Sequence, residues 1–374
     1  MNNHMVTRSL AAVCGVGLLA SLAACGDNTA APESTSATKD GVASLTGEYA
    51  GAGASSQQTA VEAWIEGFRS QAPNATVAYN PSGSGAGVST FLTGSTVWAG
   101  SDKALSAEEI EQSKSVCASG TAFDVPVYIS PIAIVFNLRG VSDAGKHINM
   151  DASTIAKVFN GKITRWNDPT LAKQNPDLDL PDLPITVVHR SDKSGTTLNL
   201  LEYLKATAGK DWPYQLSENW PNDVGQGAKG TSGVISTIDQ ANGTIGYADL
   251  SQAGDMGTVA VKVGGEYTEI SADAASKAVA DSKLDESVPG ANRVVLDINH
   301  ATTEPGAYPI VLVSYDIACP IYRDENTARF AKSWLGYITG NAGQDQAKNA
   351  TGSAPLPENI AQYVRASIDA IEVK

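Results

Sequence analysis

Basic side chains are scarce in this sequence. Its 26 Lys and Arg residues are outnumbered by 40 Asp and Glu residues, which gives a formal net charge of −14 at pH 7. Nucleic acids and anionic membrane surfaces bind proteins through clustered Lys and Arg. The composition disfavours both, and we expect no nucleic-acid partner. An anion that binds here must be held by local dipoles and hydrogen bonds, because the overall field repels it.

Histidine and cysteine are equally rare. The 374 residues contain four of each. Metal sites need several such ligands at short, regular spacings, whereas His147, His189 and His300 are scattered along the chain. We therefore expect no metal site and no cofactor.

The N-terminus carries an apolar stretch that follows a short polar start. The stretch from Leu10 to Ala24 follows Arg8 and is too short to span a bilayer as a mature helix, which is typical of a signal peptide over residues 1–24. It ends in Leu-Ala-Ala before Cys25 and resembles the bacterial lipobox, in which the cysteine is acylated after cleavage. The alternative is an ordinary signal peptide followed by a chance cysteine.

We predict that Cys25 becomes a lipidated N-terminus on the outer face of the cell membrane, with the lipid as the only membrane anchor. Residues 25–41 are small and polar, and they cannot bury enough apolar surface to order themselves, so we predict a flexible tether. Cys117 and Cys319 also remain in the exported chain. In an oxidising compartment they could form a disulfide, or they could be two separately buried thiols.

About 330 residues follow the tether, which is more than one hydrophobic core usually spans and indicates two domains. Apolar runs that fit strands alternate with helical patterns, so the predicted class is α/β. The run from Val125 to Leu138, interrupted at Pro131, predicts a strand that leaves one domain and enters the next. The run from Ala307 to Ala318 would carry the chain back. We predict a discontinuous lobe I (residues 42–128 plus 307–374), a lobe II (residues 129–306) and no internal repeat.

Individual elements can be placed by periodicity. Val61, Trp64 and Phe68 lie on one face of a predicted helix, Trp334 lies in another that ends at Gly340, and Ser106 with Glu109 forms a predicted capping box. A hairpin is predicted over Val259–Ile270. Buried strands are predicted at Thr76–Tyr79, Val97–Ala99, Ile185–Val188 and Ile310–Val313.

Three segments rich in glycine and hydroxyl residues each lie between a predicted strand and a predicted helix. They are Gly51–Ser56, Ser82–Gly87 and Arg190–Thr196. A helix N-terminus presents unpaired backbone N–H groups and a positive dipole end, and small residues let an oxyanion approach them. Any one such segment could be an ordinary turn, but three in equivalent positions predict an anion pocket.

Known nucleotide motifs do not explain these segments. None of the three contains G-x-x-x-x-G-K-[ST], and Gly83, Gly85 and Gly87 do not form G-x-G-x-x-G. The predicted ligand is therefore a small oxyanion rather than a nucleotide.

Two charged residues refine this prediction. Arg190 has a planar guanidinium group that can hydrogen-bond to two oxygens of an oxyanion at once. Asp102 follows the predicted Val97–Ala99 strand, and an ionised carboxylate in an anion site is favourable only if the ligand carries a proton that it can donate. Alternatives are a turn aspartate for Asp102 and a surface ion pair between Arg190 and Asp192.

With these motifs the sequence resembles the phosphate-binding lipoprotein of the high-affinity phosphate ABC importer. The resemblance begins near Leu45 and continues to the C-terminal region. The similar segments, in order, are Gly51–Ser56, Ser82–Gly87, Ala99–Leu105, Ile155–Trp166 and Arg190–Thr197.

The resemblance implies a periplasmic-binding-protein-like fold of type II, in which two α/β lobes joined by crossing hinge strands enclose a ligand cleft. The ligand would be inorganic phosphate and the partners would be membrane permease subunits, with the binding protein acting as a monomer and not as an enzyme. Asp192 would orient Arg190. Phosphate contacts are expected at Ser55, Ser56, Ser84, Asp102, Arg190, Ser194, Gly195 and Thr196. Ser56 departs from the family, where an aromatic residue is common, but the expected contact is the backbone N–H.

The sequence leaves two other interpretations open. The same fold could bind sulfate, molybdate or another oxyanion. Alternatively, an exported serine hydrolase or phosphatase could use Ser194 with His189 as base, although the sequence has no G-x-S-x-G elbow.

Overall fold

The computed structural model describes residues 39–142 and 146–373. The predicted signal peptide and Cys25 lie outside these residues. Within them, no helix combines the length and apolar character needed to cross a bilayer. The tether prediction extends too far, because Lys39–Ala43 form helix α1. Arg329 explains the difference, since its Nη2 atom donates a 2.8 Å hydrogen bond to the carbonyl of Gly41 and holds this turn against the folded chain.

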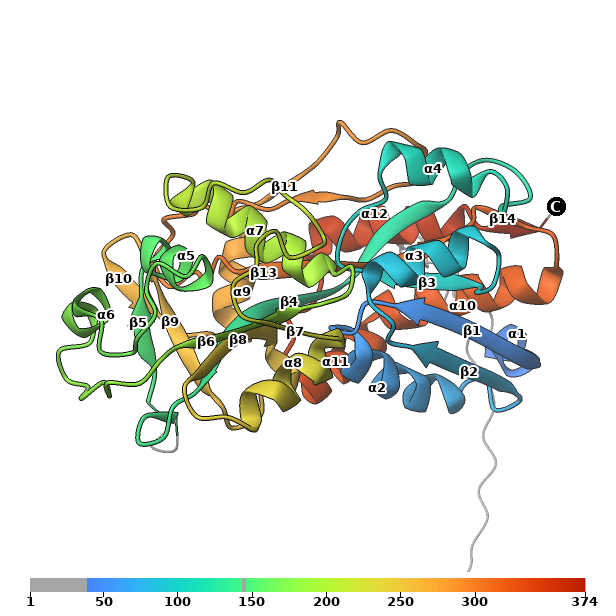
Figure 1. Ribbon diagram of the computed structural model, residues 1–374. Coiled ribbons are helices and arrows are strands. Elements are labelled where there is room, and N and C mark those ends of the chain that lie inside the picture. Colours follow the sequence, from blue (N-terminus) through green and yellow to red (C-terminus); the bar gives the residue numbers. More distant parts are fainter. Residues whose placement is uncertain (1–38, 143–145, 374) are drawn as a thin grey trace, which may run out of the picture. The chain divides into compact units, whose positions relative to one another are not determined.

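A mixed sheet of eleven strands forms the centre of the described chain (Figure 1). Its strand order is β2-β1-β3-β13-β4-β8-β6-β7, and β9, which also pairs with β4, adds β5 and β10. The strands are β1 (Gly47–Gly53), β2 (Ala75–Asn80), β3 (Trp98–Ser101), β4 (Phe123–Asn137), β5 (Ile148–Met150), β6 (Thr186–Arg190), β7 (Gln226–Ala228), β8 (Thr244–Asp249), β9 (Gly257–Val263), β10 (Glu266–Thr268) and β13 (Val311–Ala318). Two small sheets pair β11 (Lys283–Leu284) with β12 (Leu296–Asp297) and β14 (Ile321–Tyr322) with β15 (Glu372–Val373).

The sheet has a first part, formed by β1, β2, β3 and β13, and a second part, formed by β5–β10, and β4 pairs with strands of both. Helices pack against each part, with α2 and α3 beside β1–β3 and α8 beside β6 and β8. The helices are α1 (Lys39–Ala43), α2 (Gln58–Arg69), α3 (Ser84–Leu92), α4 (Ala107–Ser113), α5 (Ala152–Phe159), α6 (Pro169–Gln174), α7 (Gly195–Ala208), α8 (Gly230–Asp239), α9 (Ala272–Ala280), α10 (Glu325–Thr339), α11 (Asn341–Thr351) and α12 (Glu358–Asp369), with a short 3₁₀ turn η2 (Leu250–Gln252).

β4 joins the two parts of the sheet. Its first half, Phe123–Pro131, pairs with β13, and its second half, Ile132–Asn137, pairs with β8. All of its residues except Asn137 are buried, which explains the long apolar run in the sequence. β13 returns antiparallel between β3 and β4, so the two apolar runs lie side by side at the junction.

The periodicity predictions hold for the elements that they addressed. Trp64 and Phe68 are buried on α2, and Phe68 packs edge-on against Trp334 of α10 with ring centroids 5.4 Å apart. Both hydrogen bonds of the predicted capping box are present at the start of α4. β9 and β10 form the predicted hairpin. Each predicted strand overlaps an observed one, with boundaries that shift by one to a few residues.

Two connections tie distant parts of the chain together. Cys117 and Cys319 form a disulfide across a sequence separation of 202, with Cα atoms 5.3 Å apart. Between β11 and β12, Arg293 reaches Asp124 on β4 with hydrogen bonds of 2.6 and 2.7 Å, and these side chains are 1% and 0% exposed. Arg293 also donates to the carbonyl of Leu105 at 2.8 Å. The segment after α9 is thus attached to the β4 end that pairs with β13.

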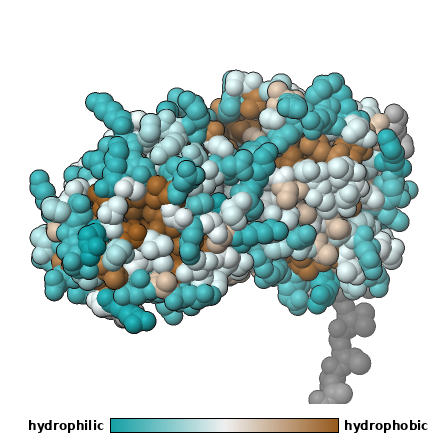
Figure 2. Space-filling model, viewed as in Figure 1, coloured by the Kyte–Doolittle hydropathy of each residue, from teal (hydrophilic) through white to brown (hydrophobic). Residues whose placement is uncertain are grey.

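The surface is predominantly polar with interspersed apolar areas (Figure 2). Two large apolar side chains are about half exposed, Leu216 at 48% and Tyr363 at 51%. Leu216 precedes the strand β7 and lines a groove described below.

A buried acid on β13 makes stability depend on pH. Burial raises the pKa of Asp316 to about 8, which the hydrogen bond from Gln57 only partly offsets. The unfolded side chain releases its proton near pH 4, so between about pH 4 and 8 the folded state binds more protons and this group lowers stability as pH rises. Wild-type stability should fall between pH 5 and 8, and we expect this fall to be smaller in Asp316→Asn by about 4 kcal/mol at most. Urea denaturation of both proteins at the two pH values measures it, and an identical pH dependence in both would contradict the assignment.

Candidate functional site

The starts of several helices converge near β3 and β6. The segment after β1 leads into α2, the segment after β2 into α3, and the segment after β6 into α7. α3 begins at Ser84, so only the first two residues of the predicted Ser82–Gly87 segment precede the helix. All eight predicted contact residues are buried, namely Ser55, Ser56, Ser84, Asp102, Arg190, Ser194, Gly195 and Thr196. One residue from each of the three predicted segments, Ser56, Ser84 and Thr196, hydrogen-bonds to Asp102, so the structure brings these segments together.

Asp102 is the centre of this cluster. It follows β3 and is 2% exposed. The Ser56 hydroxyl donates to its two carboxylate oxygens at 2.7 and 2.8 Å, and Thr196 Oγ1 donates to Oδ2 at 2.7 Å. A further hydroxyl, that of Ser314, donates to Oδ1 at 2.6 Å. An ionised carboxylate only accepts hydrogen bonds, so a ring of hydroxyl donors matches its charged form.

Ser84 connects Asp102 to the start of α7. Its Oγ accepts hydrogen bonds from the backbone N–H groups of Asp102 at 3.1 Å and Gly195 at 3.3 Å. A Cβ on Gly195 would lie 2.7 Å from Cβ of Asp102 and 2.8 Å from its carbonyl carbon. Only glycine allows the first turn of α7 to approach this closely.

Arg190 ends β6 and forms a two-pronged ion pair with Asp192. Arg190 Nε donates to Oδ1 at 2.8 Å and Nη2 donates to Oδ2 at 2.5 Å. Asp192 Oδ1 also accepts from the backbone N–H of Gly230 at 3.1 Å. Burial raises the pKa of Asp192, but the hydrogen bonds and charge of Arg190 outweigh it, so the net pKa lies below its usual value. Asp192 thus stays ionised and fixes the plane of the Arg190 guanidinium.

The remaining predicted residues act at helix starts. Ser194 is the N-cap of α7, where its Oγ accepts from the backbone N–H of Thr197 at 3.2 Å. Ser55 Oγ lies 3.0 Å from Thr231 Oγ1 and accepts from the backbone N–H of Thr231 at 3.0 Å. These bonds link the loop after β1 to the start of α8, on the other part of the sheet.

Sequence reasoning missed several members of the cluster. Gly230 and Thr231 open α8 after β7, the same strand-to-helix arrangement as the three predicted segments, so the same signal could have found them. Asn199 lies inside α7, and its Nδ2 donates to the carbonyl of Asp102 at 2.7 Å. Ser314 lies within an apolar strand, where nothing in the local sequence marks it.

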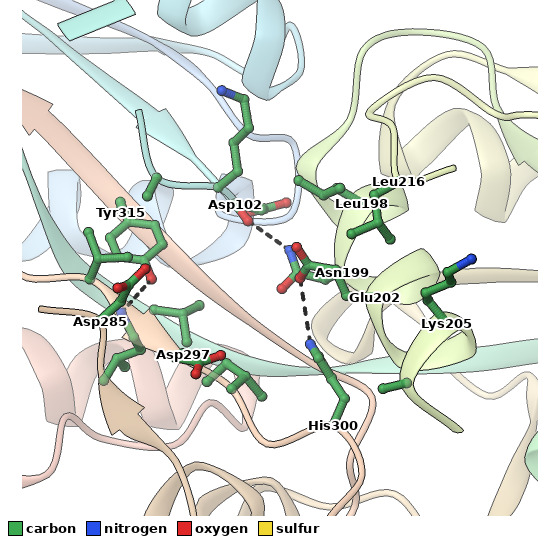
Figure 3. A pocket seen from close by; sticks show the side chains of 17 residues that line it. Asp102, Leu198, Asn199, Glu202, Lys205, Leu216, Asp285, Asp297, His300 and Tyr315 are labelled. Atoms are coloured by element: carbon green, nitrogen blue, oxygen red, sulfur yellow. Dashed lines mark hydrogen bonds and ion pairs between the residues drawn. The ribbon is translucent and has the colours of Figure 1, made fainter. Parts of the chain in front are cut away.

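A groove of about 530 Å³ opens beside Asp102 (Figure 3). It lies between α7, which contributes Asn199 and Glu202, and the segment that carries Asp297 and His300. Nε2 of His300 is 3.6 Å from the Glu202 carboxylate. The residues that line it do not include Arg190 or the donor loops, so the groove and the donor cluster are separate features that share Asp102 and Asn199. In the described part of the chain, no group of His, Cys, Asp and Glu has a metal-binding arrangement.

Comparison with known proteins agrees with this geometry. A family model described as a PBP superfamily domain matches residues 30–342. The phosphate-binding protein PstS 2 of Mycobacterium tuberculosis is 35% identical over 361 residues, which cover 94% of this chain and 95% of that protein. The chain belongs to the PstS family of phosphate-binding proteins.

Another PstS relative is similar over nearly its whole length. PstS 3 of Mycobacterium leprae is 33% identical over 369 residues, 95% of this chain and 97% of that protein. A solved structure, described as a high-affinity periplasmic phosphate-binding protein bound with phosphate, is 19% identical with a TM-score of 0.67 and covers 86% of this chain and 93% of that chain. The predicted fold, two α/β lobes joined by crossing strands, is confirmed for this PstS-family chain.

Proposed function

We propose that this chain binds inorganic phosphate outside the cytoplasm and delivers it to the membrane permease of an ABC importer. The observation that carries the proposal is the environment of Asp102, a buried carboxylate among hydroxyl donors and helix N-termini near the Arg190–Asp192 pair. Membership of the PstS family supports the same ligand.

Each part of the site has a role in this proposal. Backbone N–H groups at the starts of α2 and α7, the Ser84 and Ser194 hydroxyls and the Arg190 guanidinium would bind the phosphate oxygens. Ser56 and Thr196 would turn their hydroxyls from Asp102 to the ligand. Asp102 would then accept the proton of the phosphate P–OH group. Sulfate carries no proton at neutral pH, so it would face an unpaired negative charge.

Ligand capture would follow from the division into lobes. In this proposal lobe I comprises residues 42–128 and 307–374, and lobe II comprises residues 129–306. Hydrogen bonds such as Ser84 to Gly195 and Ser55 to Thr231 cross between them and support a closed arrangement in the structure. The closed monomer, anchored outside the membrane by lipid on Cys25, would dock on the permease without turning over its ligand.

The hydrolase interpretation has less support. Ser194 Oγ accepts from the backbone of α7 as an N-cap, while His189 Nδ1 contacts the carbonyl of Arg190 at 2.9 Å. The His189 ring also stacks on Trp220 with centroids 5.0 Å apart. Each residue of the supposed pair is therefore engaged elsewhere, and a phosphate-contacting serine needs no activation.

Isothermal titration tests the proposal directly. We expect the chain from residue 26 onward, stripped of ligand, to bind phosphate one-to-one and to show no sulfate response at neutral pH. In Asp102→Asn, the amide can donate to an oxyanion, so we expect phosphate affinity to fall, sulfate binding to appear and selectivity to drop at least tenfold. Unchanged selectivity would contradict the role of Asp102. Absence of phosphate binding by the folded wild-type protein would overturn the proposed function.

A further inference from the structure

Ser314 reaches the site from the crossing strand β13. It is fully buried and lies 212 positions from Asp102 in sequence, yet it donates the 2.6 Å hydrogen bond to Asp102 Oδ1. The register of β13 against β4 shifts between Ser314 and Tyr315, while Tyr315 pairs with Ser101 on β3. Such irregularities re-aim side chains beside functional sites. The irregularity thus lies at the residue that contacts the carboxylate, and its extra residue, Val127, is on β4.

The direction of this hydrogen bond is set by a second buried residue. Gln57, which precedes α2 and is also fully buried, donates from Nε2 to Ser314 Oγ at 2.7 Å. An amide nitrogen donates and does not accept, and a hydroxyl has a single proton. Ser314 therefore accepts from Gln57 and gives its proton to Asp102. The two hydrogen bonds therefore have the same direction, with Gln57 donating to Ser314 and Ser314 donating to Oδ1 of Asp102.

Ser314 differs in this respect from the other two donors to Asp102. Ser56 and Thr196 lie at helix starts among the proposed phosphate contacts, and their hydroxyls can turn to a ligand. Ser314 has a buried partner on each side and keeps one acceptor position of Asp102 occupied. That contact restrains Oδ1, while the other hydroxyl donors to the carboxylate are those of Ser56 and Thr196.

We infer that Ser314, oriented by Gln57, is a positioning residue that holds Asp102 as the acceptor for the ligand's proton and so sets selectivity for a protonated oxyanion. The inference rests on the proposed function. It predicts that removing this one hydroxyl, which belongs to the crossing strand, changes which anion is bound.

The test is titration of Ser314→Ala and Ser314→Cys with phosphate and with sulfate. A hydrogen bond to a charged group is lost in the alanine variant, so we expect phosphate affinity to fall about tenfold and the phosphate-to-sulfate affinity ratio to fall by a similar factor. Cysteine fills the volume and donates weakly, so its ratio should be intermediate. Ser130→Ala is the matched control, because Ser130 is a fully buried serine on the other crossing strand, opposite Leu312. Its ratio should equal that of the wild type.

A double-mutant cycle separates positioning from general damage. If Ser314 acts through Asp102, Ser314→Ala should change the ratio little when Asp102 is already Asn. The inference would be overturned if Ser314→Ala kept the wild-type phosphate-to-sulfate affinity ratio, or if it lowered that ratio equally in the wild-type and Asp102→Asn proteins. Either result would leave the proposed function intact. Thermal unfolding verifies each variant, and if the alanine variant does not fold, the ratio of Ser314→Cys decides. Only a folded wild-type protein that does not bind phosphate overturns both.

Discussion

Arg190→Ala should weaken phosphate binding by about 100-fold or more. The substitution removes two charge-assisted donors from a side chain that is 3% exposed, and hydrogen bonds to charged groups contribute about 1.5–3 kcal/mol each. It also leaves the buried Asp192 carboxylate without its partner, next to an anion that it repels. Isothermal titration measures the change.

Two further variants make this result specific. Arg190→Lys keeps the charge but loses the planar fork, so we expect it to recover only part of the affinity. Arg165→Ala removes an arginine that is 46% exposed and paired with Asp182 on the surface, and it should bind phosphate like the wild type. A loss of less than tenfold in Arg190→Ala would place Arg190 outside the binding site.

The largest effect on stability is expected for Arg293→Ala. The partner carboxylate of Asp124 is 0% exposed, and removing one member of a buried ion pair typically costs 3–5 kcal/mol, because the other charge stays buried without compensation. Asp124 retains the backbone N–H of Leu105, at 2.7 Å, as a donor, which is a weaker partner than a guanidinium. Urea denaturation at neutral pH measures the change in unfolding free energy.

The matched control is an exposed pair. Arg69→Ala breaks a contact with Glu66 in which both side chains are more than 60% exposed, and such pairs contribute less than about 1 kcal/mol. Equal losses of unfolding free energy in Arg293→Ala and Arg69→Ala would mean that burial does not determine how much these ion pairs contribute to stability. A loss below about 1 kcal/mol in Arg293→Ala would show that solvent reaches Asp124 once the guanidinium is gone.

Local patterns in the sequence predicted the elements and the donor loops well. Periodicity located α2 and α10, and strand-to-helix order located the starts of α2, α3 and α7, because both signals depend on neighbouring residues. The end of the tether was misplaced, since α1 is held by Arg329, nearly 290 positions away. Contacts of this kind are set by tertiary packing and leave no trace in composition.

The same reason accounts for what was missed in the site. Ser314 lies in the middle of an apolar run, and its role depends on the order of β3, β13 and β4 and on a register shift between β13 and β4. Arg293 and Asp124 are 169 positions apart, and neither belongs to a motif. Asp102 and Arg190 could be singled out because each adjoins a segment with its own chemical signature.

The place of β13 in the sheet has a consequence for the order of folding. β3 and β4 are separated by a strand that begins at Val311, so a chain that is synthesised from its N-terminus exposes two unpaired strand edges until residues 311–318 have been added. Such edges invite pairing with other chains. The residues between β4 and β13, which include the second part of the sheet, must therefore fold, or be kept from pairing with these edges, before β13 inserts between β3 and β4. The Cys117–Cys319 disulfide can form only after Cys319, which follows β13, has been added to the chain. Once formed, it links the end of β13 covalently to the segment before β4.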